Sequence, residues 1–131
     1  MKYRLDDTIN LVINEFSDMK KIYDEQISLY NDISCVFYLC EFTPYVLAKL
    51  QQNDESELKN IFSFIERLLV NGDDGVVNMI ICQVIENLYD SGVCTNHSSI
   101  LRKFSGECTL QNFVDCLGGE EKAKWEKSKA A

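Results

Sequence analysis

The chain has 131 residues, of which 46% are hydrophobic and 26% charged, a composition typical of one folded globular domain and not of a disordered chain. Its one proline and six glycines supply too few turn residues for an all-β sandwich. With 13 basic and 21 acidic residues the formal net charge is −8. Such a chain would repel nucleic acid, because nucleic-acid recognition requires Lys and Arg at the phosphates.

Two further features predict where the protein works. Residues 1–7 contain no apolar stretch of the kind that directs secretion. The longest apolar run, residues 36–40, is far too short to cross a membrane. Without an export signal the six cysteines are expected to be reduced thiols, so the sequence predicts a cytoplasmic protein that binds no membrane.

The N-terminal third shows the apolar spacing of helices. A first helix is predicted after Asp6 and Asp7, because apolar residues recur on one helix face at Ile9, Val12, Ile13 and Phe16. A more polar stretch, residues 20–30, keeps roughly helical spacing. Residues 33–42 are apolar on nearly all sides and are therefore expected at the centre of the fold. Thr43 and Pro44 suit the N-cap and first turn of a new, short helix that ends at Leu50.

The clearest signal is a pair of helices in residues 54–90. Asp54 and Glu57 resemble a capping box at the start of a helix that ends at Asn71–Gly72, with Gly72 as a left-handed cap. Its predicted buried face comprises Leu58, Ile61, Phe62, Ile65, Leu68 and Leu69. Asp73 and Asp74 are expected to cap a second helix, which stops at Ser91–Gly92. The predicted buried residues of that helix are Val77, Ile80, Ile81, Val84 and Leu88. The short connection between the two helices predicts an antiparallel hairpin.

The remaining segments predict smaller helices. These cover residues 98–104, 110–117 and 120–127, and residues 127–131 are expected to lack structure. No segment has the alternating pattern of a strand, and no tandem repeat is present. We therefore expect an all-α fold in which residues 1–131 form a single domain of antiparallel helical hairpins, with the hairpin 54–90 at its centre and short C-terminal helices.

Residue types that perform catalysis are scarce. His97 is the only histidine, so a catalytic relay would depend on it, but its polar loop is explained as well by the start of a helix. No glycine-rich phosphate loop is present. The sequence therefore favours a protein that is not an enzyme and has no catalytic residues and no cofactor.

Metal binding is disfavoured by residue spacing. Residues 72–75 superficially resemble part of a calcium loop, but apolar residues fill the ligand positions that follow, and capping alone explains both aspartates. Zinc ligands usually come in close pairs, whereas the nearest cysteines, Cys35 and Cys40, are five residues apart. Cys40, Cys108 and Cys116 are instead interpreted as small core residues. We expect no metal site.

The negative charge is concentrated in the predicted hairpin. Residues 53–90 hold eight carboxylates and two cations, a net charge of −6, whereas the charges of residues 91–131 nearly cancel. Helix capping and solubility explain part of this pattern. The alternative is a docking face for a basic macromolecule, with Tyr89 as an anchor at its rim. The candidate partner-binding residues are Asp73, Asp74, Asn78, Glu86, Tyr89 and Asp90.

The same hairpin resembles a known family. The chain has the pattern IFxFIExLLxxGD at residues 61–73, VxN at 76–78, IENL at 85–88, and a leucine-glycine pair followed by a tryptophan at residues 117–125. In these motifs it resembles small all-α immunity proteins found beside bacterial polymorphic or contact-dependent growth inhibition toxins. The resemblance implies a cytoplasmic bacterial protein that binds and neutralises a cognate toxin domain, most often a basic nuclease such as an RNase.

Two other classes of function stay open from the sequence. The protein could be a non-catalytic helical adaptor that binds a cellular partner, or an enzyme whose cofactor site leaves no motif. A neighbouring reading frame that encodes a toxin-like domain would favour immunity over an adaptor. A stoichiometric metal in the purified protein would favour the enzyme.

Overall fold

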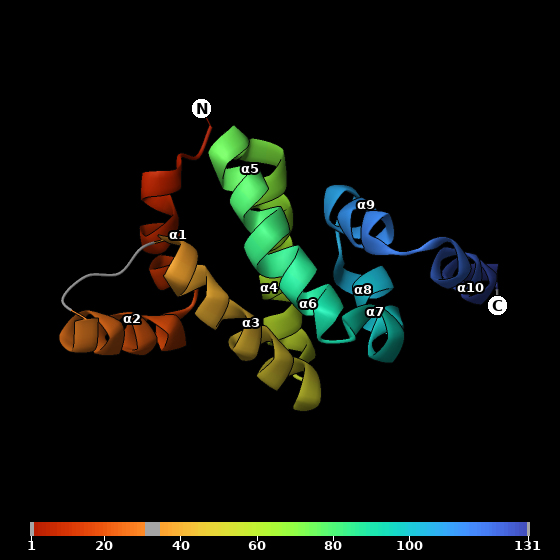
Figure 1. The fold of residues 1–131 in the computed structure, drawn as a ribbon. Helices are drawn as coiled ribbons and strands as arrows, with labels where there is room; N and C mark the ends of the chain where they lie inside the picture. The colour runs from red at the N-terminus through yellow and green to blue at the C-terminus, as the bar shows by residue number, and fades with distance from the viewer. Residues whose placement is uncertain (1, 31–34, 131) are drawn as a thin grey trace.

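The computed structural model describes residues 2–30 and 35–130, which are helical over most of their length (Figure 1). Within these residues no strand forms, and the one β-type pairing is an isolated bridge between Tyr3 and Gly72. The predicted all-α class is therefore confirmed.

The helical elements follow one another with short connections. In chain order they are η1 (Leu5–Asp7), α1 (Thr8–Glu15), α2 (Ser17–Tyr30), α3 (Cys35–Gln51), α4 (Glu55–Asn71), α5 (Asp74–Ile80), η2 (Ile81–Ile85), α6 (Glu86–Asp90), α7 (Val93–Asn96), α8 (Ser98–Phe104), α9 (Glu107–Cys116) and α10 (Gly119–Ala130). η1 is a 3-10 turn and η2 is a π-helix. Sequence reasoning missed α7, which spans only one turn.

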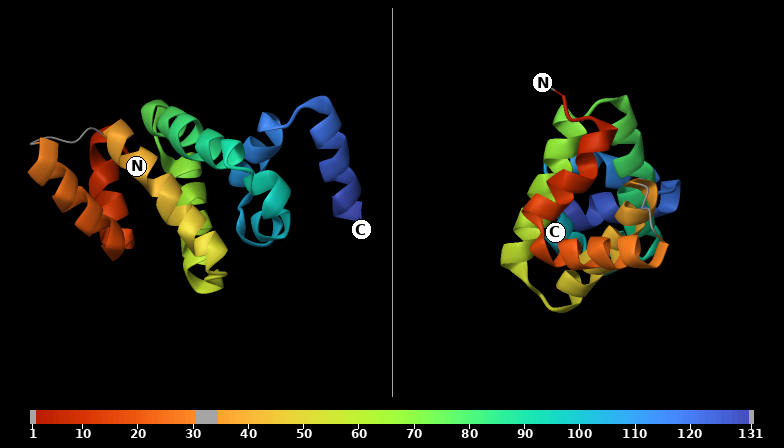
Figure 2. Two further views of the ribbon diagram at one scale, coloured as in Figure 1. Left: turned by 60° about the horizontal axis from the view of Figure 1, so that its bottom comes forward. Right: turned by 90° about the vertical axis from the view of Figure 1, so that its left-hand side faces the viewer.

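Helix α4 lies at the centre of the molecule. The elements α5, η2 and α6 follow one another as a continuous helical rod beside α4, and α3 packs against both. Figure 2 shows α1 and α2 on one flank of this layer and the short helices α7 to α9 on the other. α10 extends from α9 at the far end of the molecule (Figure 1).

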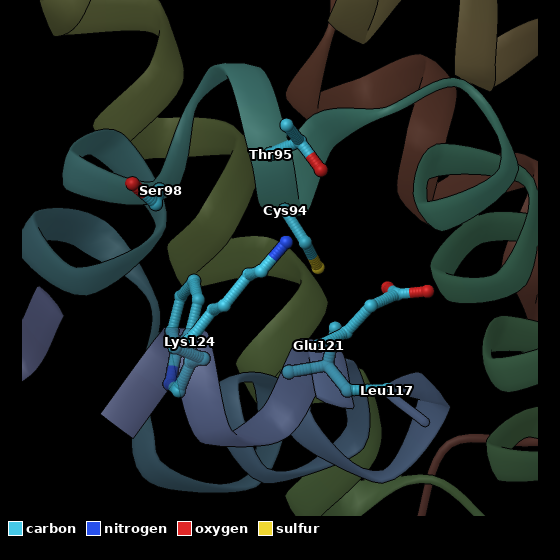
Figure 3. A pocket seen from close by; sticks show the side chains of 7 residues that line it. Cys94, Thr95, Ser98, Leu117, Glu121 and Lys124 are labelled. Atoms are coloured by element: carbon cyan, nitrogen blue, oxygen red, sulfur yellow. The ribbon is translucent and has the colours of Figure 1, made fainter. Parts of the chain in front are cut away.

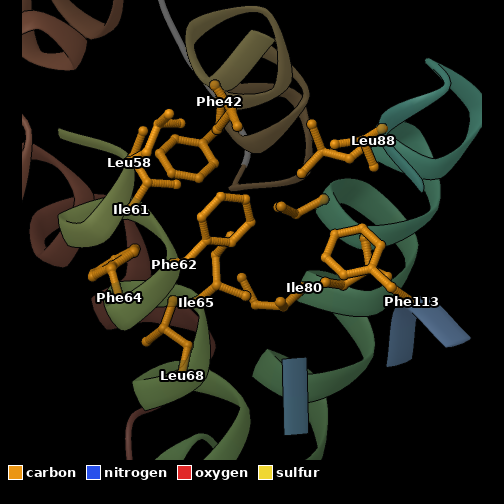
Figure 4. Close-up of a cluster of buried hydrophobic side chains, with 14 of the residues drawn as sticks. Phe42, Leu58, Ile61, Phe62, Phe64, Ile65, Leu68, Ile80, Leu88 and Phe113 are labelled. Carbon is orange, nitrogen blue, oxygen red and sulfur yellow. The ribbon is translucent and has the colours of Figure 1, made fainter. Parts of the chain in front are cut away.

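The core is built on α4, as the sequence predicts. Five of the six predicted residues (Leu58, Ile61, Phe62, Ile65 and Leu68) are fully buried, whereas Leu69 is half-buried. Phe64 is also buried because Phe16, which lies between α1 and α2, packs against it edge to face, with 5.2 Å between ring centroids. Figure 4 shows Phe42 of α3, Ile80 of α5 and Phe113 of α9 closing around this helix. α4 is therefore covered on more than one side.

The prediction of a new helix at Thr43–Pro44 is wrong. α3 runs without a break through Pro44, which is exposed, and Thr43 is buried instead of capping a helix end. The Thr43 hydroxyl donates a hydrogen bond to the carbonyl oxygen of Gln83 in η2, 3.4 Å away. Packing of α3 onto η2 thus overrides the local helix-breaking tendency of proline. The predicted central stretch 33–42 falls mostly outside the residues whose side chains the structure describes; its last residue, Phe42, is buried.

The turn between α4 and α5 is made differently from its prediction. Gly72 has φ −80° and ψ 153°, so it is extended and not a left-handed cap. It is needed for close packing, because a Cβ there would collide with the carbonyl oxygen of Leu68 and lie 2.6 Å from Cγ1 of Val76. The N-terminal segment covers this turn: the Tyr3 amide donates to Asn71 and the Asp73 amide donates to Tyr3. The second helix of the hairpin ends as predicted, with Gly92 at φ 86°.

The buried residues of this second helix, which form a stripe along one side, differ in part from the prediction. Ile80, Val84 and Leu88 are buried as expected, but Val77 and Ile81 are half-exposed. The other buried positions are Val76, Met79 and Ile85. Four of these residues, at 76, 80, 84 and 88, are spaced four apart. In an α-helix of 3.6 residues per turn, such a stripe drifts around the axis by about 40° at each step.

The π-helix η2 explains how the stripe stays in line. The Glu86 amide bonds to the carbonyl of Ile81, five residues back, so this turn winds less tightly than an α-helical one. The looser turn offsets the drift, so the buried residues stay on one side of the rod, which packs on α4 at α5 and on α3 and α9 at η2 and α6. Apolar periodicity alone does not reveal a π turn, so the sequence predicts burial of Val77 and Ile81 where the structure leaves them half-exposed.

The C-terminal helices differ from their predictions mainly in their limits. α8 spans the predicted residues, α9 begins at Glu107, three residues before the predicted Leu110, and α10 continues to Ala130 through the segment expected to lack structure. Within the described ranges, no helix combines the length and the apolar character that crossing a membrane requires.

The close packing at Gly72 leads to a first prediction. Gly72→Ala should lower the free energy of unfolding by about 1–3 kcal/mol, because the added methyl group overpacks the turn. Gly75→Ala is the matched control: its Cβ would meet only Oδ1 of Asp73, at an ordinary 3.4 Å. It should be neutral or slightly stabilising, since alanine favours helices. Urea unfolding of both variants measures the difference, and equal effects would show that the turn tolerates a side chain at residue 72.

Candidate protein-binding face

The exposed side of the α5–η2–α6 rod carries most of the predicted partner-binding residues. Asp74, Asn78, Glu86 and Asp90 are all exposed, and we call these four residues the acidic face. They share the four-residue spacing of the buried stripe, so the π turn that aligns one side of the rod also aligns the other. Cys82, which is exposed, occupies the remaining position of this series.

The two aspartates at the tip of the hairpin have different roles. Asp73 is the N-cap of α5, and its Oδ1 accepts a hydrogen bond from the Val76 amide at 3.0 Å. Asp74 is exposed and makes no cap bond, so the prediction that both aspartates cap the helix is only half right. The carboxylate of Asp73 is already engaged within the fold, whereas that of Asp74 faces solvent.

Three carboxylates at the start of α4 are engaged in contacts within the fold. Asp54 caps the helix by accepting from the Glu57 amide at 3.2 Å, as the sequence predicts. Glu55 forms an ion pair with Lys103 of α8 at 2.6 Å. Glu57 bonds to the Tyr45 hydroxyl. These acids connect neighbouring helices and contribute little to an outward docking surface.

Glu66 holds α9 against α4. Its carboxylate accepts hydrogen bonds from the Thr109 amide and hydroxyl, both at 2.8 Å, and from the Cys108 amide at 3.2 Å. Gly106 is required here, because a Cβ at that position would collide with the Glu66 side chain. Burial alone would raise the pKa of Glu66, but the bonds from Thr109 and Cys108 outweigh it and lower the pKa. A carboxylate from another helix thus caps the start of α9, which explains why α9 begins earlier than its own sequence predicts.

Tyr89 occupies a different position from the one expected of an exposed anchor. It is half-buried, and its hydroxyl donates to Oε2 of Glu121 in α10 at 2.9 Å. This hydrogen bond, with burial as the second cause, raises the pKa of Tyr89. The ring therefore lies at the boundary between α6 and α10, and its polar end is occupied by a residue of this chain.

Further acids lie near the acidic face on other helices. Burial chiefly raises the pKa of the Cys116 thiol in α9, and the charges of Glu86, Asp115 and Asp90 add to the effect. Asp115 is exposed and belongs to the same negative region. Sequence reasoning missed Asp115 and Glu121, because the charges of residues 91–131 nearly cancel in sum and only their placement separates the acids from the lysines.

The described cysteines and the histidine are spread over several elements in the C-terminal half of the chain. Cys108 is exposed, so its prediction as a core residue is wrong, whereas Cys116 is half-buried and packs against the core. Cys94 is buried, and burial raises the pKa of its thiol to about 11. The Cys40 side chain lies outside the described residues. His97 lies between α7 and α8 and makes no side-chain cap bond. Among the described residues, no three His, Cys, Asp or Glu side chains gather in a way that could hold a metal ion.

Comparison with known proteins gives one family. Residues 9–114 match the family described as "Domain of unknown function (DUF7674)", which covers most of the chain. No curated protein and no solved structure matches the chain.

The contacts of Glu66 lead to a second prediction. Glu66→Gln should lower the free energy of unfolding by about 1–3 kcal/mol at neutral pH, because an amide cannot replace a carboxylate that accepts three hydrogen bonds. Since the folded-state pKa of Glu66 lies below its ordinary 4.5, the stabilisation is complete above that value and is lost as pH falls through the folded pKa. Urea unfolding at neutral and acidic pH measures both effects.

Glu55→Gln serves as the control, because the ion pair of Glu55 with Lys103 is exposed and should contribute less than about 1 kcal/mol. The two proteins that carry Glu and Gln at position 66 should approach equal stability in acid. A constant difference at every pH would contradict the role assigned to the Glu66 charge.

Proposed function

We propose that this chain, which belongs to the DUF7674 family, is an immunity protein: it binds a cognate toxin domain through the acidic face and thereby neutralises the toxin. The partner would be a protein with a basic surface, such as a nuclease. The chain itself would perform no catalysis and would need no cofactor, metal or nucleic acid. Its place of action would be the cytoplasm, where the nucleic acid attacked by such a toxin is found.

One observation carries the proposal. Five of the eight hairpin carboxylates are engaged in caps, an ion pair or hydrogen bonds of the fold, whereas Asp74, Glu86 and Asp90 are exposed. No described residue lies within ion-pair distance of these three carboxylates. Contacts within the fold explain the first group. Asp74 lies in the first turn of α5, where the helix dipole favours a carboxylate, whereas Glu86 and Asp90 lie within and at the end of the rod and have no such role. Negative charge on one side of a rigid rod is the arrangement expected of an electrostatic docking surface.

The physical chemistry of such a partner supports the assignment. A nuclease must bind phosphates, so its active site is rich in Lys and Arg. A row of carboxylates would attract that site over several ångströms and accelerate encounter, while the rod itself blocks access by nucleic acid. The short hairpin connection and the buried stripe hold the rod rigid, so few side chains must be ordered on binding. The motif resemblance at residues 61–73 and 85–88 points to the same class of protein.

A third prediction tests the face directly. The triple variant Asp74→Lys, Glu86→Lys, Asp90→Lys should bind the toxin-like domain encoded in the neighbouring reading frame at least about tenfold more slowly at low ionic strength. Asp73 is left unchanged because it caps α5. Stopped-flow association across a salt series measures the rates, and protection of cells that express the toxin domain measures neutralisation.

The matched control carries Asp18→Lys, Asp24→Lys and Glu25→Lys, three exposed acids of α2. It changes the net charge by the same amount on a different element, so it separates the effect of the face from that of total charge. Equal slowing in both variants would remove the role assigned to the acidic face. Tight binding without protection of the cells would indicate an adaptor instead of an immunity protein.

A further inference from the structure

Most described side chains of the C-terminal helix α10 are exposed. Among residues 119–127, Trp125 is the one buried side chain, with 7% of its surface exposed. Its neighbours on the helix, such as Lys122 and Ala123, are exposed. A helix of this length is marginal in water on its own, since isolated helices shorter than about 12–15 residues are barely stable. The order of α10 must therefore come from the docking of Trp125.

The contacts of Trp125 are local and partly electrostatic. The guanidinium of Arg102, on α8, lies over the indole ring at 4.1 Å from its centroid. Nη2 of the same arginine donates to the backbone carbonyl of Trp125 at 2.6 Å. A second attachment is the bond between Tyr89 and Glu121. α10 thus docks through the Trp125 ring, the Trp125 carbonyl and Glu121, whereas α9 is held to α4 by buried Phe113 and the three bonds of Glu66.

Open cavities adjoin the indole on both sides of α10. One, of about 320 Å³, lies between α7 and α10 and is lined by Cys94, Thr95, Ser98, Leu117, Glu121, Lys124 and Trp125. Figure 3 shows side chains of α7 and α10 bordering this cavity. The other, of about 350 Å³, lies toward α9, with Leu110 and Val114 in its wall. The Trp125 ring is therefore bordered by open space on two sides, whereas the residues around α4 are closely packed.

The connection to α9 consists of half-buried Leu117, which packs against the core, and exposed Gly118. Leu117 is extended, and added Cβ atoms at Gly118 and Gly119 would meet no atom within 4 Å. Two successive glycines in open space allow the backbone to rotate at low steric cost. The two glycines thus allow rotation of the backbone between Leu117 and the start of α10.

From these four features we infer that α10 is a displaceable arm: it docks through Trp125 into the socket between α8 and α9 and undocks as a unit while the remaining helices stay folded. When it undocks, the Trp125 socket is exposed and the Tyr89 hydroxyl is released from Glu121. If the proposed function holds, this release makes Tyr89 available beside the acidic face, so partner binding and arm position are coupled. The arm itself does not depend on that function.

A fourth prediction tests the arm in the full-length protein without any partner. Trp125 is the sole tryptophan, so its fluorescence reports docking of α10, while far-UV circular dichroism reports the whole helical fold. In a urea titration the fluorescence midpoint should fall at a lower concentration than the dichroism midpoint. The amide hydrogens of residues 122–127 should also exchange at least tenfold faster than those of α4. Coincident midpoints together with equal protection would overturn the inference.

Three variants sharpen the test. Glu121→Gln weakens the bond to Tyr89 and should shift only the fluorescence midpoint, whereas Lys122→Gln, an equally exposed change on the same helix, should shift neither. Trp125→Ala should make residues 120–127 exchange freely while α4 keeps its protection. If either Glu121→Gln or Trp125→Ala destabilises all helices together, α10 is part of the cooperative core and no arm exists. If α10 undocks independently but the unmodified protein does not bind the toxin-like domain, the result counts against the proposed function alone.

Discussion

The structure depends on keeping two faces of one helical rod in register over α5, η2 and α6. An α-helix of this length would let residues spaced four apart drift around its axis, turning part of the apolar stripe toward solvent. The π turn at residues 81–85 removes much of that drift. As a result Val76, Ile80 and Leu88 all reach the core, and the acidic face points away from it along the same rod. The backbone bond from Glu86 to Ile81 therefore organises both the packing and the candidate site.

The carboxylates of the hairpin separate into two groups once their contacts are known. Asp54, Glu66 and Asp73 accept hydrogen bonds from backbone amides and so complete helix ends that would otherwise leave donors unpaired. Those of the acidic face have no such role. The division matters because a negative total charge by itself says little about function, whereas carboxylates held outward by a rigid scaffold define a surface with a particular kind of partner.

Local sequence signals predicted α4 and its caps, because the helix start at Asp54 and the buried residues near Phe62 depend on neighbours within a few positions. These local signals mispredicted the helix limits that depend on contacts between residues far apart in the sequence. Pro44 stays within a helix because η2 packs on α3, and α9 starts early because Glu66 reaches it from α4. For the candidate site, exposure of Asp74, Glu86 and Asp90 followed from helical periodicity, but the bond of Tyr89 to α10 required the fold.

The bridge between Tyr3 and the α4–α5 turn has a practical consequence for anyone who handles this protein. The two backbone hydrogen bonds fix the start of the chain beside Asp73, at one end of the acidic face. Any affinity tag, fusion or dye placed ahead of Tyr3 would emerge next to that face and crowd an approaching macromolecule. The end of α10 lies away from the hairpin tip (Figure 1), so a label there would leave the Asp74 end of the face open.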